Sequence, residues 1–236
     1  MEIFKPKVID FETKSSLFEF LGSYIVDRVI DLSSDQGIVR LGLTGGKSIL
    51  PLYKLLATNY GLTWDRVQTF LTDERYINLD NPESNYYQIK QVFGEDFIKE
   101  LGEFNYFDTS LPLDITAKNY QEKLEALDGQ IFDINLLSPG LDGHIASLFP
   151  NTDKLGKQPK MVLETVAPPE YETAKRLSLS SEALLSSNEI ILVLIGTKKT
   201  DVLSEMLDGT LKIADYPVKM LLAHPNLVIY HTISDS

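Results

Sequence analysis

The stretch FDINLLSPGLDGHIASLFP, residues 132–150, joins an apolar run to a loop that carries two glycines, an aspartate and a histidine. The run 132–137 is typical of a buried strand, and Gly140 and Gly143 allow the backbone after it to turn sharply. His144 can take and return a proton at cellular pH, since the ordinary pKa of imidazole lies near neutrality. Asp142, two residues earlier, is placed to orient it. The stretch predicts chemistry at a strand end, and a purely structural Asp-x-His turn is the alternative that it leaves open.

Apolar patterns typical of strands and apolar patterns typical of helices alternate along the rest of the chain. Strands are predicted at 37–43, 67–71, 104–107, 132–137, 160–166, 176–180, 189–195 and 227–232. Helices are predicted over 15–32, after 44–48 to about 57, from 81–84 to 93, over 117–127 and over 198–207, with a loop at 151–159. Because strands alternate with helices, we expect an α/β fold, a three-layer α/β/α sandwich with a mostly parallel sheet, in a single domain spanning 1–236.

The composition excludes several classes of protein. The chain has 236 residues, no cysteine, three histidines and a formal net charge of −12. Without cysteine there is no disulfide framework and no thiolate metal site, and the histidines lack metal-ligand spacing, so His224 and His231 are interpreted as structural or surface residues. An acidic surface repels nucleic acid and anionic lipid. No apolar run approaches the roughly 18 residues that span a bilayer, and the N-terminus lacks a secretory pattern, so a cytoplasmic protein is expected.

Four predicted loops follow strands in the same sense, and each carries a basic side chain. They are residues 44–48, 72–75, 140–144 and 196–199. In a parallel sheet, the ends that follow the strands share one edge, where ligands bind. We therefore expect Lys47, Arg75, His144 and Lys199 to meet at one edge of the sheet, although they lie far apart in the sequence.

The segment Gly45-Gly46-Lys47-Ser48 comes directly after a predicted strand and opens a helix. Free backbone N–H groups and the positive end of a helix favour a phosphate at such a position. A nucleotide-binding P-loop does not fit, because its first glycine would fall at position 41, which is Leu41. A tight turn without a ligand remains the structural alternative.

Charged residues at two other strand ends are candidate ligands for an anion. Arg75 can grip a phosphate or carboxylate through two hydrogen bonds, with Asp73 or Glu74 neutralising or orienting it. Lys198 and Lys199 stand at a predicted helix start, where the helix dipole disfavours cations, and this conflict hints at a functional role. A solvated run of surface charges is the alternative interpretation of 73–75.

Several of these segments together resemble the 6-phosphogluconolactonases. The resemblance is carried by Leu43-Thr44-Gly45-Gly46 with the segment 52–56, by the segment 72–76 with Ser84-Asn85-Tyr86, by the segment 140–150, and by Arg176-Leu177-Ser178-Leu179 followed by the segment 196–199. The segment 140–150 is the most specific of them. The glucosamine-6-phosphate deaminases and isomerases share the fold and the Asp-Gly-His segment, whereas Asp-Glu-Arg and Ser-Leu-Phe-Pro point to the lactonases.

The resemblance implies hydrolysis of 6-phospho-D-glucono-1,5-lactone to 6-phosphogluconate, with no metal or organic cofactor. It implies His144 as base and then acid, oriented by Asp142, and oxyanion stabilisation by backbone N–H groups. The residues it implies for the substrate and its phosphate are Gly45, Gly46, Lys47, Ser48, Asp73, Arg75, Arg176 and Lys199. The expected partner is a phosphorylated sugar lactone, and the expected state is a monomer or weak homo-oligomer.

The chain departs from the family pattern at a few positions near these residues. Lys47 stands where the lactonases usually carry Ser or Thr, and Ser138-Pro139 stands where they carry a glycine and an apolar residue. Lys47 is therefore expected to add to or rearrange the phosphate site. Two alternatives stay open: a deaminase–isomerase acting on an amino-sugar phosphate, and a sugar-phosphate sensor that binds without turnover.

Overall fold

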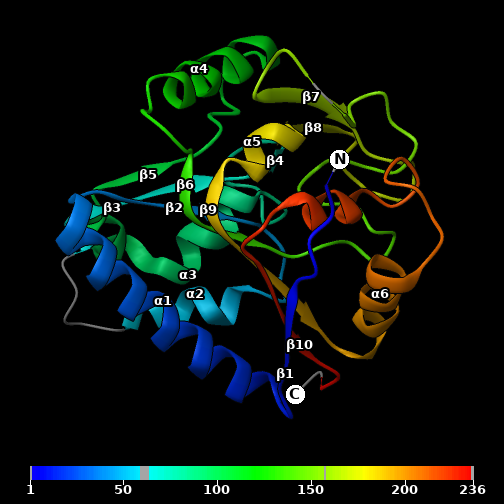
Figure 1. The fold of residues 1–236 in the computed structure, drawn as a ribbon. Helices are drawn as coiled ribbons and strands as arrows, with labels where there is room; N and C mark the ends of the chain where they lie inside the picture. Colours follow the sequence, from blue (N-terminus) through cyan, green and yellow to red (C-terminus); the bar gives the residue numbers. More distant parts are fainter. Residues whose placement is uncertain (1, 59–63, 157, 235–236) are drawn as a thin grey trace.

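A parallel sheet forms the centre of the protein. The computed structural model describes residues 2–58, 64–156 and 158–234. Within these residues, seven strands pair in parallel in the order β1-β10-β9-β6-β2-β3-β5 (Figure 1). Their bounds are β1 Lys7–Asp10, β2 Val39–Leu43, β3 Val67–Leu71, β5 Glu103–Asn105, β6 Phe132–Leu137, β9 Ser187–Ile195 and β10 Leu227–Thr232.

Helices lie on both faces of this sheet. On one face, α2 (Leu50–Thr58) packs against both α1 (Lys14–Gln36) and α3 (Asn85–Glu100), and α1 reaches β2 and β10 (Figure 1). On the other face, α6 (Thr197–Asp208) and α5 (Ser181–Leu185) pack on β9, next to a short 3-10 turn, η2 (Pro217–Ala223). The predicted α/β fold with a mostly parallel sheet between helices is confirmed.

The core forms where the predicted apolar runs meet. All six residues of β6 and the central residues 190–194 of β9 are buried, because helices cover both faces of these middle strands. Helix α1 adds a fully buried stripe of Leu17, Leu21, Ile25 and Val29. Each such side chain stabilises the fold by roughly 1.5–3 kcal/mol through removal of apolar surface from water. A rigid core of this kind holds the loops at the strand ends in fixed positions.

A small antiparallel sheet stands at the carboxyl ends of the parallel strands. It has the order β4-β8-β7, with β4 Asp73–Arg75, β7 Val162–Val166 and β8 Lys175–Leu179, and α4 (Leu113–Glu125) packs against β7. The prediction of a loop at 72–75 is wrong, because residues 73–75 form β4. Thr72 links β3 to β4, and its carbonyl accepts a 2.9 Å hydrogen bond from the backbone N–H of Leu179. This pairing, invisible in the local sequence, holds the charged segment extended.

Most other predicted elements are present with bounds shifted by a few residues, and some elements were not predicted. Strand β1, helix α5, the 3-10 turn Trp64–Arg66 and η2 are additions. Helix α3 runs past the predicted end at 93, across Gly94 with its φ of 77°. Residues 151–156 and 158–159 form turns, as expected, while residue 157 lies outside the described residues. His224 and His231 are both buried and hydrogen-bonded within the fold, the former to Ser187.

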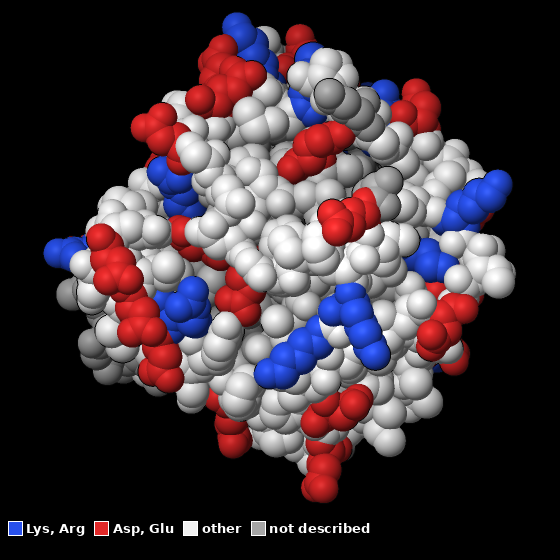
Figure 2. Space-filling model, in the orientation of Figure 1, with Lys and Arg blue, Asp and Glu red and all other residues white. Residues whose placement is uncertain are grey.

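The surface in view carries charges of both signs. Figure 2 shows acidic side chains on all parts of this face with basic side chains between them, as expected for the acidic composition. In the part of the chain that the structure describes, no helix combines the length and apolar character that a membrane span requires.

Candidate active site

A polar cavity of about 190 Å³ lies at the edge of the sheet where the parallel strands end. It collects the loops that follow β2, β3, β6 and β9, together with the start of α3. The predicted residues that line it are Gly45, Gly46, Ser48, Asp73, Arg75, His144 and Lys199. Residues more than 150 positions apart in the chain thus meet at one point, because parallel strands bring their carboxyl ends to the same edge.

His144 and Asp142 form a hydrogen-bonded pair at the wall of the cavity. Imidazole Nδ1 lies 2.6 Å from Asp142 Oδ1, and the same oxygen accepts a 3.2 Å bond from the backbone N–H of His144. Burial disfavours the charge on Asp142, but the bonds from His144 outweigh it and lower the pKa of this carboxyl. Since a carboxylate only accepts hydrogen bonds, we assign the imidazole proton to Nδ1. Nε2, which has no hydrogen-bond partner among the described residues, is then free to act as a base.

Gly140 allows this pair to form. A Cβ at position 140 would lie 2.1 Å from Nδ1 and Cε1 of His144 and 2.5 Å from Asp142 Oδ1. The backbone N–H of Gly140 also donates to the carbonyl of His144 at 2.8 Å, which closes the loop. Only a residue without a side chain permits this close approach.

Replacing Gly140 with alanine is therefore expected to lower kcat about tenfold, because the methyl group displaces the imidazole from its position against Asp142. The measurement is steady-state kinetics together with thermal unfolding, so that loss of activity is separated from loss of folded protein. A Gly140→Ala enzyme with unchanged kcat would show that the tight packing of the pair has no bearing on turnover.

Arg75 and Lys199 provide positive charge in the cavity. The Arg75 guanidinium donates through Nη1 to the carbonyl of Glu83, and its Nε is buried without a partner among the described residues. Lys199 Nζ donates to the carbonyl of Pro139. Burial lowers the pKa of Lys199 to about 8, against the opposing influence of Asp142. Both cations thus line the cavity, and their contact with an anionic ligand stays a prediction.

Lys47 and Arg176, also predicted to bind the phosphate, do not line the cavity. The side chain of Lys47 is 82% exposed and lies 3.9 Å from the Glu83 carboxylate. Arg176 is buried on β8 opposite Arg75, and its Nε donates to the carbonyl of Thr173 at 2.8 Å. Burial and the nearby Arg75 lower the pKa of Arg176. Their contact with a phosphate stays a prediction.

Three polar residues at the site, two beside Asp73 and one beside Asp142, were not singled out from the sequence for their chemistry. The Asp73 carboxylate, 6% exposed, accepts a 3.1 Å bond from the Asn85 amide and a 2.7 Å bond from the Ser147 hydroxyl. Asn85 Oδ1 is buried without a partner among the described residues, and Gly45 packs directly against this amide. Tyr171 is the third, with its hydroxyl 3.2 Å from Asp142 Oδ2. Asn85 stands in a motif quoted above, whereas nothing in the sequence marks Tyr171.

Glu74 is fully buried and fixes the start of α3 beside the cavity. Its carboxylate accepts 2.7 Å bonds from the backbone N–H groups of Arg75, Asn85 and Tyr86, and a 3.0 Å bond from the Ser84 hydroxyl. Burial raises the pKa of Glu74 to about 7, while these N–H groups act in the opposite direction. The side chain therefore satisfies donors at the helix start that would otherwise be unpaired.

Replacing Glu74 with glutamine is expected to lower the free energy of unfolding by roughly 1–3 kcal/mol, because the new NH₂ group faces donors that need an acceptor. Urea unfolding followed by circular dichroism measures this loss. The matched control is Glu83→Gln, whose exposed ion pair with Lys47 contributes at most about 1 kcal/mol. Equal stability of the two variants would contradict the role assigned to Glu74.

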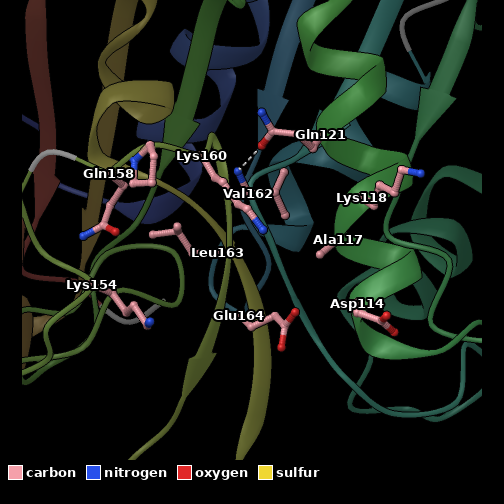
Figure 3. Close-up of a pocket in the computed structure, with 11 residues that line it drawn as sticks. Asp114, Ala117, Lys118, Gln121, Lys154, Gln158, Lys160, Val162, Leu163 and Glu164 are labelled. Carbon is pink, nitrogen blue, oxygen red and sulfur yellow. Dashed lines mark hydrogen bonds between the residues drawn. The ribbon is translucent and has the colours of Figure 1, made fainter.

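A larger cavity of about 450 Å³ lies between α4 and β7 (Figure 3). Its lining mixes apolar with charged and amide side chains, and Figure 3 shows the ends of Lys118, Lys154 and Lys160 spread around it rather than directed at one point. Two of these lysines have acidic neighbours on the surface, Glu122 at 3.6 Å and Asp153 at 3.9 Å. The smaller cavity holds buried polar groups that converge, which is the mark of a binding site. We therefore assign the candidate active site to it.

Comparisons with known proteins show the family of the chain. A family model described as glucosamine-6-phosphate isomerases/6-phosphogluconolactonase matches residues 12–229. The chain is 29% identical to the 6-phosphogluconolactonase of Thermotoga maritima over 86% of this chain and 90% of that protein. It is 30% identical to the 6-phosphogluconolactonase of Borreliella burgdorferi over 91% of this chain and 96% of that protein.

Solved structures show the same relationship. A crystal structure of a 6-phosphogluconolactonase from Shewanella baltica superimposes with a TM-score of 0.87 at 25% identity, covering 98% of this chain and all of that one. A monomeric glucosamine-6-phosphate deaminase shares the fold, with a TM-score of 0.80 at 19% identity over 96% of this chain and 97% of that one. Because the family model covers most of the chain, the protein belongs to the family of glucosamine-6-phosphate isomerases and 6-phosphogluconolactonases.

Proposed function

We propose that the protein hydrolyses 6-phospho-D-glucono-1,5-lactone to 6-phosphogluconate, the second step of the oxidative pentose phosphate pathway. The observation that carries the proposal is one cavity that holds both the His144–Asp142 pair and the cations Arg75 and Lys199. The relatives named 6-phosphogluconolactonase support it, because they match this chain over most of its length.

The arrangement suits the hydrolysis of a lactone. Nε2 of His144 takes a proton from a water molecule, and the oxygen of that water adds to the lactone carbonyl carbon. We assign stabilisation of the developing oxyanion to the backbone N–H groups of Gly45 and Gly46, residues that line the cavity. The bond from the carbonyl carbon to the ring oxygen then breaks, and Nε2 returns its proton to that oxygen. One water is consumed, and the ring opens to a hydroxy acid.

The remaining groups orient the imidazole and hold the substrate. Asp142 keeps the proton on Nδ1 and stabilises the imidazolium that forms during the reaction. Arg75 and Lys199 bind the phosphate of the substrate and thereby place the ring beside His144. We assign Asp73 and Ser48, which line the cavity, to the sugar hydroxyls. We propose that the protein acts in the cytoplasm. We also propose that it consists of one domain and is a monomer or a weak homo-oligomer.

The proposal is tested by adding the protein to freshly prepared 6-phosphogluconolactone and measuring ring opening against the spontaneous rate. We expect strong acceleration, with 6-phosphogluconate as product, and no ammonia from glucosamine 6-phosphate. Ammonia release would support a deaminase instead. Tight binding of the phosphosugar without any acceleration would identify a sensor and would reject the enzyme.

A further inference from the structure

The loop between β7 and β8, residues 167–174, places Tyr171 against the His144–Asp142 pair, a contact that the hydrolytic step itself does not use. The Tyr171 hydroxyl lies 3.2 Å from Asp142 Oδ2 and 3.2 Å from His144 Nδ1. The tyrosine ring meets the imidazole edge-on with the ring centres 5.6 Å apart, and it also packs on Phe149 at 5.2 Å. Tyr171, His144 and Asp142 are partly buried, and Phe149 is buried.

The hydrogen-bond polarity of this contact follows from the chemistry of its members. His144 Nδ1 donates to Oδ1 of Asp142, and the Tyr171 hydroxyl donates to Oδ2. Burial and the charge of Asp142 raise the pKa of Tyr171 to about 12, so the hydroxyl keeps its proton throughout the neutral range. Each carboxylate oxygen thus has its own side-chain donor, which prevents rotation of Asp142 and fixes the plane of the imidazole.

Arg176 contacts the β7–β8 loop at two residues, Thr173 and Tyr171. Its Nε donates to the carbonyl of Thr173 at 2.8 Å, and its guanidinium carbon lies 5.9 Å from the centre of the Tyr171 ring. The loop is also closed by a 2.7 Å backbone bond from Ala167 to Ala174. Arg176 is 5% exposed, so its charge is committed to the loop rather than to solvent.

We propose that Tyr171 is a positioning residue for the reaction: it locks Asp142 so that His144 presents Nε2 to the substrate, and Arg176 anchors it. This inference rests on the proposed function for its kinetic consequence but not for its effect on the imidazole. Loss of the hydroxyl leaves Oδ2 of Asp142 without its side-chain donor, so the carboxylate and the imidazole that it orients are expected to lose their fixed geometry.

The test removes only the hydroxyl, in Tyr171→Phe, which keeps the ring against His144, Phe149 and Arg176. We expect kcat to fall roughly fivefold to tenfold, the usual effect of one lost hydrogen bond, with KM changed less than about twofold. The matched control is Tyr24→Phe, which loses a 2.7 Å bond to the Glu189 carboxylate, remote from the cavity, and should keep the kcat and KM of the wild type.

The second variant, Arg176→Met, releases the loop while leaving Tyr171 intact. We expect a decrease in kcat similar to that of Tyr171→Phe, and we expect the double variant to lose less than the product of the two single losses. Fully multiplicative losses would show that Arg176 acts elsewhere and would overturn its role as an anchor.

A third measurement separates this inference from the proposed function. Proton NMR of the imidazole Nδ1–H of His144, identified among the three histidines by its loss in His144→Gln, needs no turnover. We expect this resonance to shift and to exchange faster with water in Tyr171→Phe but not in Tyr24→Phe, because Asp142, which accepts the Nδ1–H bond, loses its second side-chain donor. Such a change supports the inference even if no lactone is hydrolysed. An unchanged Nδ1–H resonance together with an unchanged kcat overturns it.

Discussion

Replacing His144 with alanine is expected to lower kcat by roughly 10²–10⁴-fold, the usual contribution of a positioned general acid–base. The reason is geometric: Nδ1 is held by Asp142 at 2.6 Å, which leaves Nε2 as the free base on the cavity wall. Arg75 and Lys199, which we propose bind the phosphate, remain in place, so KM should change little. The measurement is the initial rate of ring opening, corrected for spontaneous hydrolysis.

Binding of 6-phosphogluconate, measured by calorimetry, serves as the control for this variant. We expect the affinity of His144→Ala for this product to stay within about threefold of the wild type, because the phosphate contacts are intact. An alanine variant with normal kcat would remove His144 from the mechanism. A variant that loses product binding as strongly as turnover would make His144 a binding residue instead.

The second large effect is expected for Lys199→Ala. This substitution should lower kcat/KM far more for 6-phosphogluconolactone than for unphosphorylated gluconolactone. Loss of one charge-assisted contact costs roughly 1.5–3 kcal/mol, which corresponds to about a tenfold to 150-fold decrease in kcat/KM for 6-phosphogluconolactone. The matched control is the exposed neighbour Lys198, whose replacement by alanine should leave kcat/KM nearly unchanged. Equal losses on both lactones would show that Lys199 does not recognise the phosphate.

The charge of Lys199 gives this prediction a pH dependence. Because burial lowers its pKa to about 8, the amine is protonated below that pH and loses its charge as the pH rises through it. The preference of the wild type for the phosphorylated lactone should therefore decrease between about pH 7 and 9. Lys199→Arg stays charged over this range and should keep its preference constant.

Strands that contain unbroken apolar runs could be predicted from the sequence. Strands β6 and β9 carry unbroken apolar stretches because both of their faces are covered, and strict sequence patterns identify them. Strand β1, with only four residues and exposed ends, carries too little pattern to be recognised. Strand β4 reads as a charge run, and its extended form depends on pairing with β8, which lies 100 residues later in the chain.

The site was predictable where the topology alone gathers residues. Arg75, His144 and Lys199 lie together because each follows a parallel strand, and that argument needs no side-chain detail. The same argument fails for Lys47. This residue also follows a parallel strand, but its side chain points to Glu83 and to solvent and does not line the cavity. The argument also misses Tyr171, which stands between two glutamates in a loop and reaches the site only through the fold of the β7–β8 hairpin.

The central claim is that a single cavity both binds the phosphate and carries out the hydrolysis. A crystal structure with 6-phosphogluconate bound tests it most directly, because this product is stable where the lactone is not. We expect the phosphate within hydrogen-bond distance of Lys199 and Arg75, and the new carboxylate between His144 Nε2 and the Gly45–Gly46 backbone. Product seated in the cavity between α4 and β7, or bound with its carboxylate remote from His144, would contradict the account.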